Sequence, residues 1–342
     1  TLSASSLSPL SSSLSPEGVG VLAGALQLNT VVHSLYLRNN QRIGCTGAAL
    51  LGGLLQLQTH GHSHTDGNNL TALDLSECMI GDVGAAVLAA SLRSNRRLKS
   101  LTLDANGLGE EGAGLLAEAL IPVASTSISS ASSPASTTAA GTGTGTSSAL
   151  AAAADWLPLT HLSLNSNGIG AVGTGALANA LRPHCGNRSL TALHLAGNGL
   201  GEGGVGSLAA MLLAGGAPSL AVLGLARNNL GVRGGALISK ALGGGGSGLS
   251  SSLTRLDVSE NGLGNEGTAV IAQALLNNRC LRRLDIKHNR VGGEGLGPLT
   301  NALYRNGSLT RIELGGNTLS ASSLSPLSSS LSPEGVGVLA GA

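Results

Sequence analysis

Aromatic residues are almost absent from this chain, which has no phenylalanine, one tryptophan and two tyrosines. Hydrophobic residues nevertheless make up 42% of the sequence, so a core must be built from leucine, alanine, valine and isoleucine. Charge is also scarce, because Lys, Arg, Asp and Glu amount to 11% and the net charge is +1. A nucleic-acid-binding domain normally carries a strongly basic face, so this composition argues against a nucleic-acid partner.

Cysteine is rare as well, and Cys45, Cys78, Cys185 and Cys280 are far apart in the sequence. They include no CxxC pair and no spacing typical of zinc ligands, which argues against a disulfide framework. The N-terminal residues lack the charged and apolar regions of a signal peptide. Together these features predict a reducing, cytoplasmic location.

One uncharged stretch, residues 203–226, is long enough to cross a bilayer. A Gly-Gly pair and Pro218 interrupt it midway, and its two halves fall in register with the repeat described next. An interrupted helix leaves backbone groups unsatisfied in lipid, so we predict no membrane span.

What the sequence has in abundance is a repeat. Nine segments follow the pattern LxxLxLxxNxLG, with starts at Val32, Leu70, Leu98, Leu159, Leu190, Leu220, Leu253, Leu281 and Leu309. The shortest interval between starts, 98 − 70 = 28 residues, recurs and sets the basic period. Alternating apolar residues predict a short strand with one buried face. The segment that follows each strand, such as EEGAGLLAEAL at 110–120, places apolar residues on one helical face.

Units of strand, turn and helix bury their apolar sides only when they stack on one another. Helices need roughly 10 Å of lateral space, whereas paired strands lie about 4.8 Å apart. The stack must therefore bend with its strands on the inside. The sequence predicts one α/β array over residues 1–342, a solenoid shaped like a curved horseshoe, with parallel strands on the concave face and helices on the convex face.

Two features interrupt the regular array. Residues 121–154 are rich in Ser, Thr, Ala and Gly, and they offer too little apolar bulk to offset the entropy of ordering, so we predict a disordered insertion. Residues 1–25 are identical to residues 318–342, and register makes residues 16–26 the helix of a partial N-terminal repeat. Two explanations stay open for the identity: a fragment of a longer tandem duplication, which we favour, or a duplication introduced when the sequence was assembled.

The ninth position of the motif is asparagine in eight of the nine repeats. In a stack, a buried amide at this position can bridge backbone groups of neighbouring turns that would otherwise lack partners. We therefore predict a structural column formed by Asn40, Asn106, Asn167, Asn198, Asn228, Asn261, Asn289 and Asn317, with Cys78 as the exception.

The strand motif LxxLxLxxNxLG, followed by GxxGxxxLAxAL, resembles the leucine-rich repeats of the ribonuclease-inhibitor type. These repeats also occur in NOD-like receptors and in the GTPase-activating protein for Ran. The resemblance covers residues 32–319 and implies a scaffold that binds another protein. The aromatic-rich, acidic binding face of such inhibitors is missing here, so ribonuclease inhibition is not expected. GTPase activation of the Ran-directed type is the alternative, but the catalytic residue and the acidic tail that it requires are not recognisable.

Two motifs suggest chemistry. Four segments match GxGxxG, which is the fingerprint of a dinucleotide site, but a motif that returns with the period belongs to the repeat. His60, His62 and His64 could hold a transition metal, although a solvated loop is the simpler interpretation, which we favour. No Ser/His/Asp or Cys/His grouping has a recognisable spacing. We therefore predict neither an enzyme nor a cofactor or metal site.

The third, fifth and seventh positions of each strand motif should point into the concave surface. Toward the C-terminus the third position is arginine and the fifth is acidic, which places a basic column beside an acidic one. Such columns could dock a partner with complementary charges. Alternatively each arginine neutralises the carboxylate beside it, an interaction that contributes only ~0–1 kcal/mol when exposed. The candidate partner-binding residues are Arg255, Asp257, Arg283, Asp285, Lys287, Arg311, Glu313, Tyr36 and Arg38.

Overall fold

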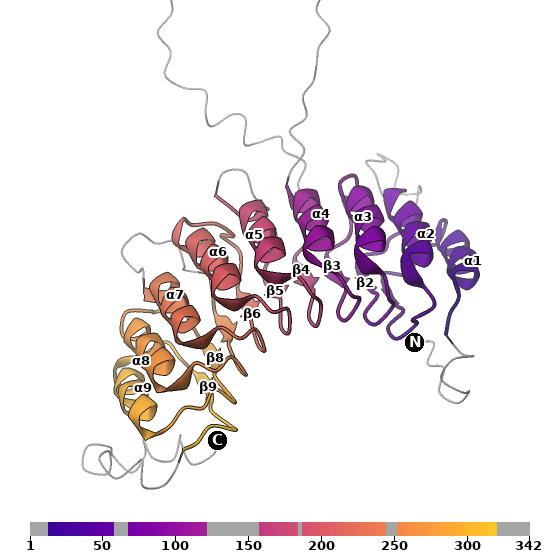
Figure 1. Ribbon diagram of the computed structural model, residues 1–342. Coiled ribbons are helices and arrows are strands. Elements are labelled where there is room, and N and C mark those ends of the chain that lie inside the picture. Colours follow the sequence, from indigo (N-terminus) through magenta and orange to yellow (C-terminus); the bar gives the residue numbers. More distant parts are fainter. Residues whose placement is uncertain (1–12, 58–67, 122–156, 184–186, 244–251, 320–342) are drawn as a thin grey trace, which may run out of the picture.

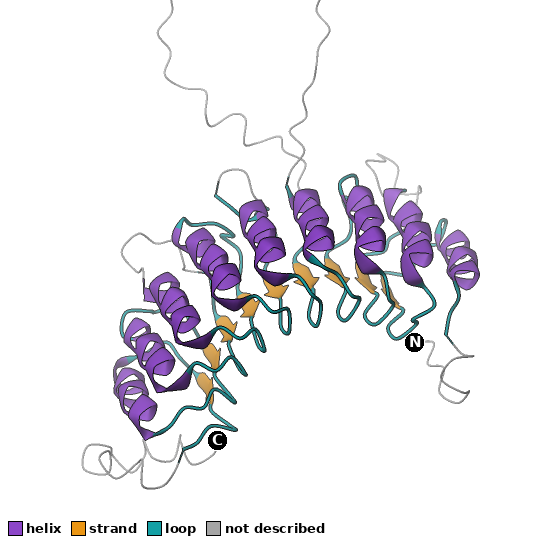
Figure 2. Cartoon of the chain, viewed as in Figure 1, coloured by secondary structure: helices purple, strands orange, loops and turns teal. Residues whose placement is uncertain are grey.

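The computed structural model describes residues 13–57, 68–121, 157–183, 187–243 and 252–319. These residues form an arc in which every strand lies on the inner side and every helix on the outer side (Figure 1). Figure 2 shows the two layers separately coloured, with short loops joining them along the inner rim. The predicted α/β solenoid with concave strands and convex helices is confirmed.

The strands within the described residues are three residues long and form one parallel sheet in chain order. They are Ser34–Tyr36 (β1), Ala72–Asp74 (β2), Ser100–Thr102 (β3), His161–Ser163 (β4), Ala192–His194 (β5), Val222–Gly224 (β6), Arg255–Asp257 (β7), Arg283–Asp285 (β8) and Arg311–Glu313 (β9).

The helices alternate with the strands, and consecutive helices pack against each other along the chain. They are Pro16–Leu26 (α1), Gly44–Gln56 (α2), Gly81–Leu92 (α3), Glu110–Leu120 (α4), Gly170–Ala180 (α5), Gly201–Leu213 (α6), Gly231–Gly243 (α7), Gly264–Leu275 (α8) and Gly293–Arg305 (α9).

Register is constant along the whole sheet. The central leucine of one strand pairs with the central apolar residue of the next, as Leu223 does with Leu256 and Leu256 with Leu284. Residues at one motif position therefore form a straight column across the sheet. Because successive side chains of a strand point to opposite faces, the central residues face the core and the flanking ones face the concave surface.

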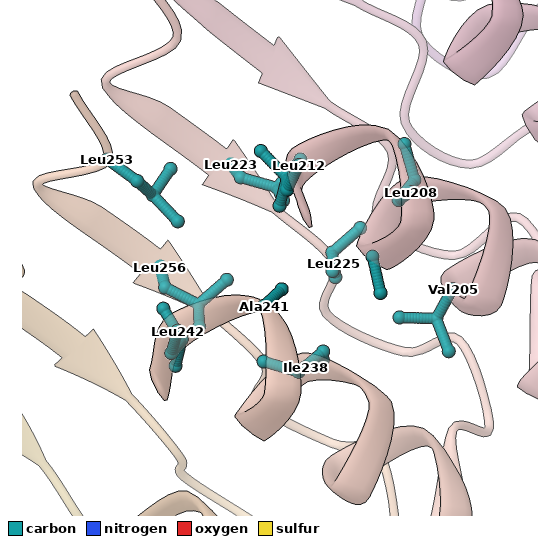
Figure 3. A pocket seen from close by; sticks show the side chains of 11 residues that line it. Val205, Leu208, Leu212, Leu223, Leu225, Ile238, Ala241, Leu242, Leu253 and Leu256 are labelled. Carbon is teal, nitrogen blue, oxygen red and sulfur yellow. The ribbon is translucent and has the colours of Figure 1, made fainter. Parts of the chain in front are cut away.

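The shared interior is visible where α6 and β6 meet α7 and β7 (Figure 3). The void left there has a volume of only about 10 Å³ and an entirely apolar lining, so it offers a water molecule no polar partner. Each leucine buried in this way stabilises the fold by about 1.5–3 kcal/mol relative to exposure. The lining residues come from two successive repeats: Val205, Leu208, Ala209, Leu212, Leu223, Leu225, Ile238, Ala241, Leu242, Leu253 and Leu256.

The glycines of the GxGxxG segments have structural roles in the repeat. In the segment at 168–173, Gly170 has φ +61°, a left-handed conformation that glycine adopts without strain. A Cβ on Gly173 would lie 2.9 Å from the Cβ of Ala113 and 3.3 Å from the Cα of Glu110 in the preceding helix. The last glycine of the segment thus allows neighbouring helices to approach closely.

The uncharged stretch at 203–226 is divided between α6 and β6, as its Gly-Gly pair and Pro218 predict. Between the two elements the chain turns at Gly215 and Ala217, which have φ +80° and +47°. Across the described ranges, no helix is long and apolar enough to cross a membrane.

Several sequence predictions fall on residues outside the described ranges. The insertion predicted at 121–154 lies there except for Ile121, and so do His60, His62 and His64. Of the duplicated segment, residues 1–12 and 320–342 lie outside as well. The predicted helix at 16–26 is α1, whose first residue is Pro16 and whose N-cap is Ser15, with Gly18 N donating to Ser15 Oγ at 3.4 Å.

Candidate binding face

The asparagine column lies at the turn that follows each strand and joins each repeat to its neighbours. The Asn228 side chain accepts a hydrogen bond from Asn198 N at 2.9 Å and donates one to Leu195 O at 2.8 Å, both in the preceding repeat. Its own backbone N–H donates to Asn261 Oδ1 at 2.8 Å in the following repeat. Each side chain of this kind therefore satisfies buried backbone groups that belong to two turns.

Burial differs along the column. Asn106, Asn198, Asn228, Asn261 and Asn289 are buried, whereas Asn40, Asn167 and Asn317 are half-buried. Cys78 occupies the same site in the second repeat, where its thiol donates to Leu37 O at 3.1 Å. Burial raises the pKa of Cys78 to about 11, partly opposed by a hydrogen bond from the backbone of Asn40, so the thiol keeps its proton at neutral pH.

A second set of asparagines, which the sequence interpretation missed, lies in the turn that leads from a helix into the next strand. Asn278 is typical: its Nδ2 donates to Leu242 O at 3.0 Å, and its Oδ1 accepts from Cys280 N and Leu281 N. The signal was available, because four of these asparagines stand three residues before the first leucine of a motif. The set comprises Asn68, Asn95, Asn187, Asn278 and Asn306.

The concave face changes character along the arc. In its middle, the sheet presents small or apolar residues at the third position, Ala192 on β5 and Val222 on β6. Beyond them the same column becomes Arg255, Arg283 and Arg311 on the adjacent strands β7, β8 and β9. The constant register therefore places three arginines on adjacent strands at the C-terminal end of the face.

The three arginines differ in their partners. Arg311 pairs with Glu313 of its own strand, with Nη2 at 2.7 Å from Oε1. Arg255 and Arg283 are exposed, and neither forms an ion pair with any residue in the described part of the chain. Two positive charges of this column are therefore available to a partner.

The carboxylates of the acidic column accept hydrogen bonds mainly from the turn that follows each strand. Asp257 Oδ1 accepts from Ser259 N at 2.9 Å and from Ser259 Oγ at 2.7 Å, and Asp285 Oδ1 accepts from Lys287 N at 3.0 Å. Each carboxylate accepts hydrogen bonds within the turn after its strand and forms no ion pair with the arginine two residues earlier. The pattern of charges in the sequence shows two adjacent columns, but these local hydrogen bonds decide which charges pair.

Lys287 pairs with the acidic side chains beside it. Its ammonium group contacts Glu313 Oε2 and lies 3.4 Å from Asp285 Oδ2. Hydrogen bonding to Glu313 raises the pKa of Lys287, and hydrogen bonds from Lys287 and then Arg311 lower the pKa of Glu313. The free positive charge therefore remains concentrated on Arg255 and Arg283. A hollow of about 140 Å³ lies along this column, lined by Arg255, Leu256, Arg283, Leu284, Asp285, Arg311 and Glu313.

The comparisons with known proteins agree with this geometry. The family described as leucine-rich repeat matches residues 68–89, 158–178, 186–209, 249–272 and 277–299. Among curated proteins, the ribonuclease inhibitor of Sus scrofa is 30% identical over 170 residues, which is 49% of this chain and 34% of the inhibitor. The match therefore spans about a third of the length of that relative.

This chain is built from leucine-rich repeats that resemble those of the ribonuclease inhibitor. Among solved structures, a chain of the yeast Rad7–Elc1 complex aligns with a TM-score of 0.37 and 14% identity, covering 92% of this chain and 81% of that one. A protein from Bacteroides fragilis aligns with a TM-score of 0.41 and 15% identity, covering 77% and 64% of the two chains. Neither alignment bears on function.

The N-terminal end of this leucine-rich repeat protein carries the other two predicted contact residues. Tyr36 on β1 is 65% exposed on the concave surface. Arg38 pairs with Glu77 of the next repeat, with Nη2 at 2.7 Å from Oε1, and hydrogen bonding to Glu77 raises the pKa of the arginine. The N-terminal candidates therefore offer an exposed aromatic ring and an arginine that is already paired. The C-terminal candidates instead include two arginines without an ion pair among the described residues.

The leucine-rich repeat face also contains a half-buried histidine that was not among the predicted contact residues. His194 on β5 leans over β6, where a Cβ on Gly224 would lie 3.0 Å from its Nδ1. Burial lowers the pKa of His194, with the carboxylate of Asp104 opposing the shift, so the imidazole is neutral at physiological pH. Within the described ranges, no group of three or more His, Cys, Asp or Glu side chains could hold a metal ion.

Proposed function

We propose that this leucine-rich repeat protein is an interaction scaffold that binds a partner protein on its concave face, through the C-terminal third of the array. The observation that carries this proposal is the pair of exposed arginines, Arg255 and Arg283, that have no ion-pair partner among the described residues. Exposed charges of this kind contribute to recognition because a complementary charge steers the partner and fixes its register. By resemblance, we propose that the array serves as the recognition part of a larger protein of the NOD-like or a related family.

We also propose a reducing compartment, the cytoplasm, as its location. The cysteines within the described residues, Cys45, Cys78 and Cys280, are free thiols. Asn187 begins an Asn-Arg-Ser glycosylation triplet, yet it is only 1% exposed and its amide bonds the backbone of the turn. A folded chain could not carry a glycan there, which fits a protein that does not pass through the secretory pathway.

No observation on the described residues favours the alternative, GTPase activation of the Ran-directed type. The hydrogen-bonded turns after the strands are occupied by the asparagine column and by the acidic side chains that close them. We therefore propose a binding role without catalysis.

The proposal is tested with the full chain immobilised and exposed to a cell extract. The concave variant Arg255→Ala, Arg283→Ala and Arg311→Ala should lose the proteins that the wild type retains. Its stability should change by less than about 1 kcal/mol, because these side chains are exposed.

The matched control replaces three exposed arginines of the convex side and thus makes the same change in charge. These are Arg182, Arg233 and Arg305, which lie after α5, in α7 and in α9. The control should retain the captured proteins. If the concave variant and the control retain the same set as the wild type, binding through this face is wrong.

A further inference from the structure

The third-position column of the concave face has a simple order of residue types over its last five strands. It runs from Ala192 and Val222 on β5 and β6 to Arg255, Arg283 and Arg311 on β7, β8 and β9. The first two side chains are small or apolar and at least half-buried, and the last three are exposed cations. An element that follows the column must therefore offer apolar residues at one end and anionic residues at the other.

The spacing of the column decides which kind of element fits. Neighbouring strands lie about 4.8 Å apart, so the arginines lie about 5 Å and 10 Å along the sheet from the first one. The strands line the inner side of the arc (Figure 1), and side chains that project from a concave face do not spread apart. An α-helix rises about 1.5 Å per residue, so residues i, i+3 and i+7 lie at about 0, 4.5 and 10.5 Å on one face.

An extended peptide fits the same column poorly. Side chains on one face of a strand recur every two residues, which is about 6.6 Å. Over two steps the mismatch with the arginine column reaches about 4 Å, whereas for the helix it stays within about 1 Å. The five strands span about 19 Å, which corresponds to about 13 helical residues.

The charges that remain free determine the chemistry of that helix. The guanidinium groups of Arg255 and Arg283 are unpaired among the described residues, while Arg311 shares Glu313 with Lys287. Arginine binds carboxylates through two parallel hydrogen bonds, and such charge-assisted bonds are the stronger ones. Two acidic residues opposite Arg255 and Arg283 therefore provide most of the electrostatic gain, and a third meets Arg311 in competition with Glu313.

Given the scaffold function proposed above, we propose that the partner element is an α-helix that lies across β5 to β9. It carries two apolar residues followed by acidic residues, spaced three and four positions apart on one face. The acidic residues pair with Arg255, Arg283 and Arg311, and the apolar residues pack on β5 and β6, where Val222 is half-buried and Ala192 is buried.

Selection from two displayed peptide libraries on the full chain tests this inference. One library presents a stable helical hairpin with one face randomised, and the other presents unstructured linear peptides of the same length. We expect tighter binders from the helical library, with Glu or Asp at i, i+3 or i+4, and i+7, and apolar residues in the two preceding turns. Tighter linear binders, helices without the acidic pattern, or an absence of binders would overturn the inference.

The best selected helix is then titrated by fluorescence anisotropy. Arg255→Ala with Arg283→Ala should weaken binding at least tenfold, and higher salt should weaken binding to the wild type. The convex control Arg182→Ala with Arg233→Ala should stay within about twofold, since these side chains lie on or after helices. A reversal, Arg283→Glu, should be rescued by a peptide with lysine at the facing position.

The outcomes separate the inference from the scaffold function on which it rests. If the helix fails to bind but the concave triple variant still loses proteins captured from the extract, the helical partner is wrong and the scaffold function stands. If neither the helix nor the captured proteins respond to the loss of Arg255 and Arg283, both fail.

Discussion

The replacement Asn228→Ala tests the hydrogen-bonded column most directly. Asn228 is fully buried, and its side chain accepts from Asn198 N and donates to Leu195 O. Alanine would remove these two hydrogen bonds and also those with Leu200 N, Leu225 O and Ala226 O. It would leave at least one buried N–H and one buried carbonyl without partners. Each such group costs about 1–3 kcal/mol, so we expect a loss of roughly 2–6 kcal/mol in the free energy of unfolding.

The matched variant is Asn317→Ala at the last strand. Asn317 accepts from Asn289 N at 2.9 Å and Val291 N at 3.1 Å, but it is only half-buried, so water can replace the lost amide. We expect a loss of about 1 kcal/mol there. Asn228→Cys, which copies the natural residue at position 78, should fall between the two.

Urea unfolding followed by far-ultraviolet circular dichroism measures all three variants. Because each repeat contacts only its neighbours, the comparison should use the shift of the transition midpoint and its steepness together. A loss in Asn228→Ala no larger than that in Asn317→Ala would refute the role assigned to the buried amides.

Two further predictions concern packing and pH. In α4, Gly112→Ala should destabilise the fold by about 1–3 kcal/mol, because its Cβ would lie 2.3 Å from Asp82 Oδ1. Gly114→Ala should be neutral or stabilising by about 0.5–1 kcal/mol, because no atom lies within 4 Å of the added Cβ. Thermal melting distinguishes the two variants, and equal effects would contradict the packing argument. The pKa of Cys78 rises from 9.0 to about 11 in the folded chain, so the unfolded thiol ionises first and stability should fall by roughly 2–3 kcal/mol between pH 9 and 11. Urea midpoints across that range should show the fall in the wild type and not in Cys78→Ser; the same fall in both proteins would exclude the thiol as its cause.

Most of the fold follows from the periodicity of the sequence. The motif starts predict the order and register of the strands, and an example is the pairing of Leu101 with Leu162 across the longest interval. The helix at 16–26 was predicted by register alone and is α1. The regular strands are shorter than the motif, but backbone hydrogen bonds between neighbouring repeats continue into the turn, as from Asn39 N to Ser76 O at 2.9 Å.

The pairing of charges on the face could not be predicted in the same way. The sequence places Arg283 two residues before Asp285, but it does not show that the carboxylate accepts from Lys287 N instead. That choice depends on the tight turn after β8 and on the neighbouring repeat. For the same reason, the ion pair of Arg311 with Glu313 and the absence of an ion pair at Arg255 among the described residues emerge only from the structure.

The constant register across β3 and β4 has a practical consequence for protein engineering. Ser100 pairs with His161 in the same way that neighbouring strands pair elsewhere, although the intervening chain is about twice the basic period. The added residues lie in the connection from the end of α4 to the start of β4, and each doubling of such a connection adds only about 0.6 kcal/mol of closure entropy. A folded reporter domain could therefore be grafted between positions 121 and 157 while β3 and β4 keep their pairing.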